Sequence, residues 1–421
     1  MKYLTPEIVK GKCVLMRVDF NVDLDEEGNV IDDFRIQKTL PTIKFLKEKG
    51  AEKIILISHL GQPKKNDFWT EKFTLRPIAD YLEKTLKEKI HFEQSEKKGS
   101  VEQGEAGSYF EQSEKQDNPY FCSLKNFKEV KNMIDKSEKD AIWLLENIRY
   151  HEAEEKNDRD FARELSQLGD LYINEAFSVS HREVASICAI TEFLPSYPGF
   201  LFEEEIKHLD NIITNSESPL VIILGGAKVE DKLPLIETFS LKADWLLIGG
   251  VIANTILKAW NFEIGNSLYE EKIIGKAKNL GSKTAELMLP GDFFVLAQNQ
   301  QKKNRELGQI EKGDNILDIG QVAAYTFGKI IQKAATIFWN GPMGKIEDKK
   351  FEDGTKTIIG AILENKTAKI IIGGGDTLMA FKILKPEYKI QNTDYRFFST
   401  GGGAMLEYLA GKSLPGLKAL S

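Results

Sequence analysis

Basic side chains follow several apolar runs in the first half of the chain. Arg17 closes the run CVLMR, His59 follows KIILIS, and Arg149 and Arg182 come after AIWLL and DLYIN. Guanidinium groups bind phosphate and carboxylate through paired, charge-assisted hydrogen bonds. A structural ion pair is the better explanation for any one arginine alone. Four basic groups at the ends of separate runs instead favour an anion pocket.

The arginines are distributed unevenly, which supports that pocket. Seven of the nine lie within the first 182 residues, although the chain otherwise prefers lysine. Asp19 and Asn21 lie in RVDFN, where the first run ends, and they can accept hydrogen bonds from a ligand hydroxyl or orient basic neighbours. Forming a turn is the alternative role of these two residues. Arg159 and Arg163 have helical spacing and are expected on a solvated helix face.

Glycine-rich segments follow apolar runs in the second half. They are GGAKVEDK from Gly225, GGV from Gly249, NGPMGKIE from Asn340, GGGDT from Gly373 and STGGGA from Ser399. A glycine-rich turn that opens a helix presents backbone N–H groups and the positive end of the helix dipole to a phosphate. Tight turns use the same residues, so each segment alone is weak evidence, and the set of five indicates phosphate binding.

Charged residues inside these segments extend the prediction. Lys228 and Lys232 lie one helical turn apart and can neutralise phosphate oxygens. Asp376 offers a carboxylate suited to Mg2+. No GxGxxG follows an apolar run, and GKS at 411–413 lacks the upstream glycine of a P-loop, with Leu406 in its place. The sequence therefore supports neither a dinucleotide-binding dehydrogenase nor a P-loop ATPase.

The elements that must hold these residues are predicted from the apolar runs. Buried strands are expected at CVLMRVD, KIILIS, AIWLL and DLYIN in the first half, and at PLVIILGG, ADWLLIGG, DFFVLA, AATIFWNG and AKIIIGGG in the second. Their alternation with helical stretches predicts an α/β fold of parallel sheets covered on both faces. Ligands of such sheets bind beyond the carboxyl ends of the strands. A chain of 421 residues is expected to form two domains.

Composition excludes several classes of protein. The net charge of -7 argues against a general nucleic-acid binder. Cys13, Cys122 and Cys188 are widely spaced without a CxxC pair, which fits reduced thiols in the cytosol. The start, MKYLTPEIVKGK, lacks the apolar core of a signal peptide, and no apolar stretch approaches a membrane span. We therefore expect a cytoplasmic protein that binds small molecules, with no nucleic-acid or membrane partner.

Residues 92–119 interrupt the pattern of strands and helices. They are rich in Glu, Gln, Lys, Ser and Gly, and they contain FEQSEK twice, at 92–97 and 110–115. Such a composition buries little apolar surface, so a mobile surface insertion is expected, with a partner-binding segment as the alternative.

Seven segments, taken in order, resemble the phosphoglycerate kinase family along nearly the whole chain: RVDFN, SHLGQP, LLENIRYHEAEEKND, GGAKVEDK, FWNGPMG, IIGGGDT and FSTGGGAMLE. The resemblance implies two Rossmann-like domains, each a parallel sheet flanked by helices, joined by a hinge helix. The implied division is a phosphoglycerate-binding domain over 1–185, a hinge region over 186–200, a nucleotide-binding domain over 201–403, and a final segment over 404–421 that returns to the first domain.

The resemblance also implies an activity. It is reversible phosphoryl transfer from 1,3-bisphosphoglycerate to MgADP, giving 3-phosphoglycerate and MgATP, by a monomeric enzyme. The transfer is implied to be direct and in line after hinge closure, so the protein positions the ligands and stabilises charge. A binding or regulatory relative without turnover is the alternative, and the retained lysines and arginines argue against it.

The family's site residues are carried over by position in this sequence. The implied substrate-binding residues are Asp19, Asn21, Arg35, His59, Leu60, Gly61, Gln62, Arg149 and Arg182. The implied nucleotide-binding residues are Lys228, Lys232, Gly250, Asn340, Glu347, Gly374, Gly375, Asp376 and Thr377. Asp376 is the implied Mg2+ contact. The implied catalytic groups are Arg35, Lys228, Gly375 and Gly402.

Two segments depart from the family pattern. SHLGQP carries Gln62 where the family usually has arginine, and AFSVSHREVAS differs from the usual AFGTAHRAHAS, beginning at Ser178. Losing one charge-assisted contact costs roughly 1.5 to 3 kcal/mol if nothing replaces it. Lys64 and Lys65 are the candidate replacements. We predict a working enzyme with weaker phosphoglycerate binding.

Overall fold

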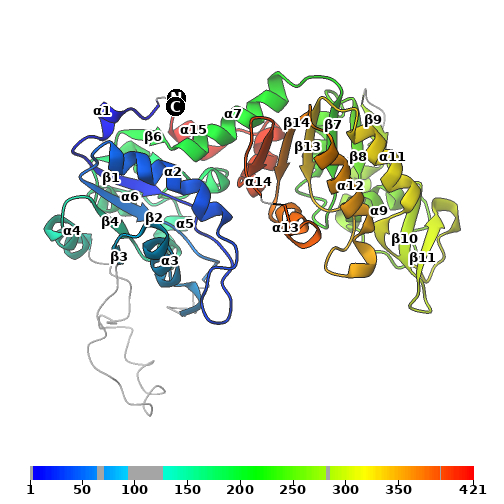
Figure 1. Ribbon diagram of the computed structural model, residues 1–421, viewed down its shortest axis with the longest axis horizontal. Helices are drawn as coiled ribbons and strands as arrows, with labels where there is room; N and C mark the ends of the chain where they lie inside the picture. The colour runs from blue at the N-terminus through cyan, green and yellow to red at the C-terminus, as the bar shows by residue number, and fades with distance from the viewer. Residues whose placement is uncertain (1–2, 64–70, 93–126, 281–284, 389) are drawn as a thin grey trace, which may run out of the picture. The chain divides into compact units, whose positions relative to one another are not determined.

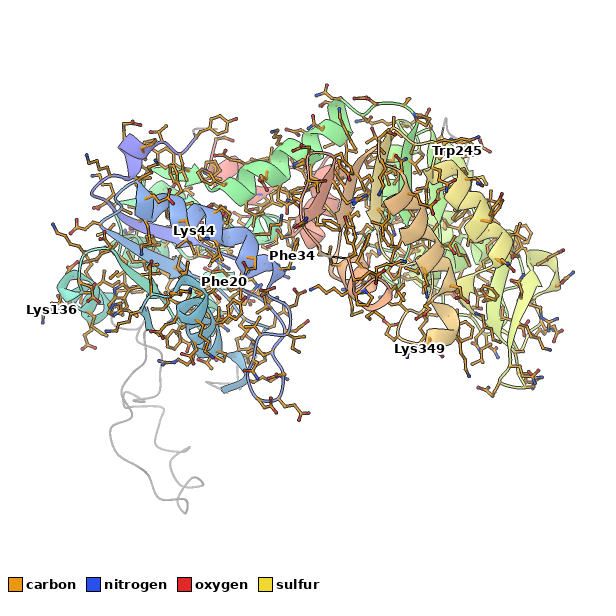
Figure 2. All side chains as sticks on the ribbon, viewed as in Figure 1. Phe20, Phe34, Lys44, Lys136, Trp245 and Lys349 are labelled. Atoms are coloured by element: carbon orange, nitrogen blue, oxygen red, sulfur yellow. The ribbon has the colours of Figure 1, made fainter. Side chains whose placement is uncertain are left out.

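The computed structural model describes residues 3–63, 71–92, 127–280, 285–388 and 390–421. The chain forms two compact units: unit 1 is Met1–Glu204 together with Leu414–Ser421, and unit 2 is Glu205–Ser413. Figure 1 shows that each unit is built on a sheet with helices packed against it, and Figure 2 adds the side chains in the same view. The predicted α/β architecture of two helix-flanked parallel sheets is thereby confirmed.

Unit 1 contains a six-stranded parallel sheet in the order β3-β4-β2-β1-β5-β6. Its strands are β1 (Cys13–Arg17), β2 (Lys53–Ile57), β3 (Ile90–Phe92), β4 (Ala141–Leu144), β5 (Leu171–Asn174) and β6 (Ser196–Pro198). β1 is central, since Val14 pairs with Ile54 of β2 and Leu171 of β5. The carboxyl ends of β1, β2 and β5 therefore meet at one edge, where the predicted anion pocket belongs.

Helices cover both faces of this sheet. They are α1 (Pro6–Val9), α2 (Phe34–Glu48), α3 (Arg76–Leu86), α4 (Phe127–Lys136), α5 (Glu152–Glu155), α6 (Arg159–Ser166) and α15 (Pro415–Ala419). Val14 and Met16 of β1 pack in one core with α2 and α3, whereas Leu15 packs in a second core with α4 and α6. Side chains alternate across a strand, so one apolar run supplies both cores.

Unit 2 contains a six-stranded parallel sheet in the order β15-β14-β13-β7-β8-β9. Its strands are β7 (Leu220–Leu224), β8 (Trp245–Ile248), β9 (Glu286–Met288), β13 (Thr336–Asn340), β14 (Lys369–Gly373) and β15 (Arg396–Ser399). The helices of this unit are α8 (Leu233–Phe239), α9 (Gly250–Ala259), α10 (Ile274–Ala277), α11 (Gln321–Ile331), α12 (Asp353–Glu364), α13 (Gly375–Leu384) and α14 (Gly402–Leu409).

A separate three-stranded sheet corrects one prediction. The run DFFVLA forms β10 (Asp292–Leu296), but it pairs antiparallel with β11 (Lys302–Glu306) and β12 (Asn315–Ile319) instead of joining a parallel sheet. The connection from β10 to β11 is a short hairpin, which can join only antiparallel strands.

The long helix α7 (Phe200–Thr214) contains the boundary between the two units. Its first backbone N–H groups are bound within unit 1, Phe200 N to Thr42 Oγ1 at 3.2 Å and Leu201 N to Glu175 Oε1 at 3.3 Å. Within unit 2, Glu205 accepts from Ser399 Oγ at 2.6 Å. The helix is therefore anchored by buried side chains in both units.

Short 3-10 turns complete the elements: η1 (Glu71–Phe73), η3 (Ile148–Tyr150), η4 (Phe177–Val179), η5 (Ala189–Glu192), η6 (Glu271–Ile273), η7 (Leu307–Gln309) and η8 (Lys349–Phe351). Nearly all of the predicted insertion over 92–119 lies outside the described residues; Phe92 is the last residue of β3. Within the described ranges, no helix has the length and apolar character needed to cross a bilayer.

Candidate active site

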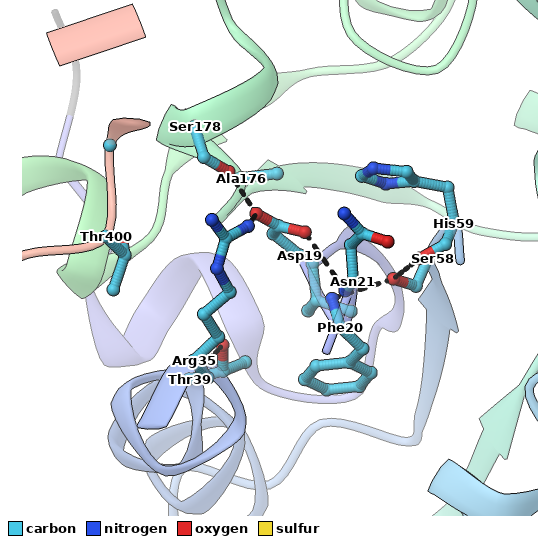
Figure 3. A network of polar contacts seen from close by, with 12 residues as sticks. Asp19, Phe20, Asn21, Arg35, Thr39, Ser58, His59, Ala176, Ser178 and Thr400 are labelled. Carbon is cyan, nitrogen blue, oxygen red and sulfur yellow. Dashed lines mark hydrogen bonds and ion pairs between the residues drawn. The ribbon is translucent and has the colours of Figure 1, made fainter. Parts of the chain in front are cut away.

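Asp19, just beyond β1, is the centre of a polar network in unit 1 (Figure 3). Its Oδ2 accepts hydrogen bonds from Arg35 Nη1 on α2 and from Ser178 Oγ in η4, and its Oδ1 accepts from Asn21 N at 3.1 Å. Burial raises the pKa of Asp19, but the Arg35 charge and the hydrogen bonds from Ser178 and Asn21 outweigh burial and hold that pKa well below its usual range. The ionised carboxylate therefore fixes the Arg35 guanidinium at the sheet edge.

The loop after β2 is tied to the same edge. Asn21 Oδ1 accepts from Gly61 N at 2.8 Å, and Arg149 Nη1 donates to Gly61 O at 2.6 Å. Gly61 has a φ of +59°, and a Cβ there would lie 2.4 Å from an aromatic carbon, so only glycine fits. Leu60 is buried before it, and Gln62 is exposed after it.

His59 lies buried beside Arg17. Its Nδ1 is 3.1 Å from Arg17 Nη2. Burial lowers the pKa of His59, the nearby Arg17 charge lowers it further, and Asp19 only partly opposes them, so this pKa falls well below its usual range. The imidazole is therefore neutral at physiological pH.

Three arginines line a cavity of about 260 Å3 in unit 1. They are Arg17, Arg149 and Arg182, and the cavity is also lined by Glu154, Glu155 and Glu183. Burial, followed by repulsion from Arg182 and Arg17, lowers the pKa of Arg149 to about 10. A pKa of about 10 keeps the Arg149 guanidinium charged at neutral pH, so an anion in this cavity offsets the repulsion that Arg149 experiences from Arg182 and Arg17.

The structure brings most of the implied substrate residues together in unit 1. Asp19, Asn21, Arg35, His59, Gly61 and Arg149 are joined by hydrogen bonds or by mutual charge effects, and Arg182 lines the adjoining cavity. Lys64 and Lys65 lie outside the described residues. Sequence reasoning missed the bond from Ser178 to Asp19, although Ser178 already stood out as a departure from the family pattern.

A larger cavity, of about 560 Å3, belongs to unit 2. Its walls come from the turns after β7, β8 and β13 and from strands β10 and β12, and they include the apolar side chains of Leu268, Phe293, Leu296, Ile316, Ile319 and Met343. Of the implied nucleotide residues, Gly250, Glu347 and Asp376 line it. The contribution of β10 and β12 was not predicted, because neither DFFVL nor NILDI carries a phosphate-binding signature.

The glycine-rich turns of unit 2 pack backbone against backbone at this cavity. Gly226 N donates to Pro342 O at 2.7 Å, Val251 N to Gly226 O at 3.0 Å, and Gly250 N to Met343 O at 3.0 Å. A Cβ on Gly250 would lie 2.7 Å from Gly226 N, and its φ is +58°. Glycine is therefore required here for the close approach of two turns.

The side chains of Asn340 and Thr377, both implied as nucleotide-binding residues, form hydrogen bonds to other groups of the protein. Asn340 Nδ2 donates to Gly373 O at 2.7 Å, while Thr377 Oγ1 accepts from Gly341 N at 2.7 Å and donates to Gly373 O at 2.8 Å. Both residues are buried. Their geometry is that of positioning groups, which hold the end of β13 against the turn that opens α13.

Two helix N-termini lie at the same edge of the unit 2 sheet. α13 begins at Gly375 directly after β14, and α14 begins at Gly402 shortly after the neighbouring parallel strand β15. Gly374 and Gly402 have φ values of +97° and +51°, which glycine adopts readily. The first N–H groups of a helix have no partner within it, so each turn can bind a phosphate oxygen.

Lys232 is buried at the start of α8, and Lys228 is exposed one helical turn before it. Lys232 Nζ donates to Gly225 O at 2.7 Å. Burial lowers the pKa of Lys232, Asp376 and Asp231 oppose this, and Lys228 adds to the lowering. These mutual effects place Lys228, Lys232 and Asp376 in one electrostatic environment.

The single carboxylate of this site suits a metal ion that binds together with the nucleotide. Among the residues described, no group of three or more His, Cys, Asp or Glu could hold a metal ion. Asp376 supplies an exposed carboxylate in the first turn of α13. Mg2+ is commonly bound by one or two carboxylates together with substrate phosphates and water, so one carboxylate beside a phosphate-binding turn fits it.

Comparisons with known proteins agree over the whole chain. The family model for phosphoglycerate kinase matches residues 5–412. A phosphoglycerate kinase of Coprothermobacter proteolyticus is 40% identical over 98% of this chain and 96% of its own length, and one of Aquifex aeolicus is 39% identical over 97% and 95%. The solved structure of phosphoglycerate kinase from Coxiella burnetii is 31% identical with a TM-score of 0.76, covering 98% of this chain and 96% of that one. The structure from Pyrococcus horikoshii is 28% identical with a TM-score of 0.79, covering 100% and 98%.

These similarities span both units and all of the segments that suggested phosphate chemistry. The chain therefore belongs to the phosphoglycerate kinase family, the phosphotransferases that carry a phosphoryl group from 1,3-bisphosphoglycerate to ADP in glycolysis.

Proposed function

We propose that unit 1 binds the phosphoglycerate and that unit 2 binds the nucleotide. The observation that carries the proposal is the cavity lined by Arg17, Arg149 and Arg182, whose charges repel one another. An anionic ligand stabilises such a cluster. The substrate-binding groups in this proposal are Asp19, Asn21, Arg35, His59, Leu60, Gly61, Gln62, Arg149 and Arg182.

In the same proposal, the cavity of unit 2 takes the nucleoside, and the turn at Gly374–Thr377 takes the phosphates. The apolar walls suit a base. Lys228 and Lys232 neutralise phosphate oxygens, and Gly250 and Glu347 line the nucleoside end. Mg2+ bound through the nucleotide phosphates and Asp376 neutralises charge on the transferring group.

Direct in-line transfer needs positioning and charge stabilisation, because the attacking atom is already an ionised oxygen. We assign charge stabilisation to Arg35, Lys228 and the backbone N–H groups of Gly375 and Gly402. Arg35 is held by Asp19, and both glycines open helices. Transfer also requires the two ligands to meet, so the proposal includes hinge closure, with the hinge region at residues 186–200, which lead into α7.

The decisive experiment is an assay of ATP formation from 1,3-bisphosphoglycerate and MgADP with the variant Lys228→Ala. We expect most turnover to be lost while 3-phosphoglycerate binding, measured by calorimetry, is nearly intact. Lys356→Ala is the matched control, because Lys356 is an exposed lysine of α12 in the same unit. Full turnover in Lys228→Ala overturns the assignment of Lys228. No turnover in the folded unmodified chain favours a regulatory relative instead.

We also propose that the protein is a cytoplasmic monomer. The widely spaced cysteines support a reducing compartment. Sedimentation of the purified protein across a concentration series tests the monomer, and a mass that rises to twice that of the chain contradicts it.

A further inference from the structure

Four buried side chains of unit 1 are linked in a line: Glu154 of α5, Ser186, Arg17 of β1 and His59. We propose that Glu154, Ser186 and Arg17, here called the arginine relay, fix His59 as the tautomer protonated at Nε2. His59 then offers an Nε2–H donor to the substrate. This inference rests on the proposed role of His59 in phosphoglycerate binding, and it makes the other three positioning residues.

Arg17 Nη2 lies 3.1 Å from His59 Nδ1. A guanidinium group has N–H donors and no acceptor, so it must be the donor in this bond. Nδ1 must then offer its lone pair. A neutral imidazole that accepts at Nδ1 carries its proton at Nε2.

Hydrogen bonds and burial hold the Arg17 guanidinium in this orientation. Its Nε donates to Ser186 Oγ at 2.9 Å, and its Nη1 donates to Val18 O. Only 1% of Arg17 is exposed, so the guanidinium cannot exchange these partners for bulk water. The donor that faces His59 is therefore fixed in place.

The donor and the acceptor of each hydrogen bond in the arginine relay can also be assigned. Ser186 Oγ donates to Glu154 Oε1 at 2.6 Å, and Ser186 N donates to Glu154 Oε2 at 2.8 Å. A hydroxyl has one proton, which here goes to Glu154, so Ser186 can only accept from Arg17. The Glu154 carboxylate also balances the buried Arg17 charge.

The charges that face His59 favour the neutral ring. Arg17 faces it from β1, Asp19 from the segment after β1, Arg149 from η3 and Arg35 from α2. A protonated ring would add a positive charge among three arginines and would direct an N–H at the Arg17 donor. The structure supports one uncharged form of His59, which donates through Nε2.

The direct test is nitrogen NMR of the full chain with 15N-labelled histidine rings. The chain has five histidines, and the signals missing from His59→Gln assign the ring. We expect His59 to show a protonated Nε2 and an unprotonated Nδ1 from about pH 6 to about pH 8. An Nδ1-protonated or doubly protonated ring in the unmodified protein overturns the inference, and this measurement requires neither a substrate nor a relay variant.

A second test breaks the relay at Ser186. In Ser186→Ala we expect mixed His59 tautomers and a KM for 3-phosphoglycerate about threefold to tenfold higher, with kcat little changed. Ser186→Thr keeps the hydroxyl and should restore the single tautomer. Ser166→Ala is the matched control, because Ser166 is also buried in unit 1 but donates to Arg163 O on α6. A single tautomer and an unchanged KM in Ser186→Ala overturn the relay.

The outcomes separate the two proposals. If the unmodified ring has the expected tautomer but 3-phosphoglycerate leaves its signals unmoved and fails to bind, the proposed substrate role of His59 is wrong and the relay still holds. If binding is normal but the tautomer differs, the relay is wrong and the proposed function stands.

Discussion

Lys232 Nζ donates a hydrogen bond to the carbonyl oxygen of Gly225 at 2.7 Å. Gly225 directly follows β7, and Gly226 next to it lines the larger cavity. If this glycine-rich turn binds phosphate as proposed, Lys232 can exchange the carbonyl for a phosphate oxygen through a small movement of its side chain.

The first prediction concerns the charge of Lys232. Lys232→Met should raise the KM for ADP on the order of tenfold to a hundredfold, because a charge-assisted bond to phosphate is worth roughly 1.5 to 3 kcal/mol. The melting temperature should change little, since burial already disfavours the charged lysine and lowers its pKa. Steady-state kinetics and calorimetry check both. Lys242→Met, at an exposed lysine after α8, is the control, and an unaltered KM for ADP contradicts the role of Lys232.

The second prediction concerns Ser178. Its hydroxyl donates to the Asp19 carboxylate that holds Arg35. Ser178→Ala should loosen this pair and raise the KM for 3-phosphoglycerate by about threefold to tenfold. Ser178→Thr, which keeps the hydroxyl, should retain the original value. Equal KM values in the alanine variant and the unmodified enzyme would mean that the bond does not position Arg35.

The third prediction concerns Gln62, which the structure places on an exposed loop beside Gly61. Gln62→Arg should lower the KM for 3-phosphoglycerate by on the order of tenfold, because it adds one charge-assisted contact. The effect should weaken as ionic strength rises, since an exposed charge is screened by salt. Titrations at low and high salt provide the measurement, and a KM that does not respond to the substitution removes this position from the site.

The fourth prediction concerns the pH dependence of stability. Burial is the largest cause that raises the pKa of Glu175 to about 8, from an ordinary value of 4.5. The folded chain then holds a proton that the unfolded chain releases between these two values, so stability falls as pH rises through this window. Glu175→Gln is nearly isosteric and always neutral.

Urea unfolding at a series of pH values measures this difference. The midpoint of the unmodified chain should fall relative to that of Glu175→Gln as pH rises toward about 8, and the two curves should converge in acid. Parallel curves throughout the range would show that Glu175 is ionised in the folded protein.

The fifth prediction contrasts two glycines. Gly374 has a φ of +97°, and a Cβ there would lie 2.5 Å from Asn340 Nδ2. Gly374→Ala should therefore cost about 1 to 3 kcal/mol and raise the KM for ADP. Gly360 lies within α12, where an added Cβ meets no atom within 4 Å, so Gly360→Ala should gain up to about 1 kcal/mol. Denaturant midpoints that shift in the same direction would contradict the contrast.

The sequence predicted the parts of the fold that depend on burial alone. Runs such as KIILI and LVIIL became central parallel strands, because both faces of those strands are covered. The short strand β9 and the charged strand β11 were not predicted, because ELM and KKNRE become strands only by pairing with a neighbour. Strand pairing is a tertiary interaction that local residue preference does not encode.

The sequence named the residue types of the candidate site, but it could not give their contacts. Arg35 and Asp19 could be named in advance, yet their ion pair became visible only in three dimensions. Asn340 and Thr377 have the types of ligand-binding residues, but Asn340 Nδ2 and Thr377 Oγ1 both donate to Gly373 O. Sequence motifs indicate which residue types a site contains, whereas the hydrogen-bond partners of those residues depend on the three-dimensional structure.

The segment Leu414–Ser421 affects when unit 1 can complete its folding during translation. Gly416 N donates to Ser180 O at 2.9 Å, and Leu414 is fully buried within unit 1. During translation, residues 1–204 therefore emerge from the ribosome early. Residues 414–421, which complete unit 1, emerge only after all of unit 2 has been synthesised. Although most of unit 1 is translated first, unit 1 cannot form all of its native contacts until unit 2 has been synthesised.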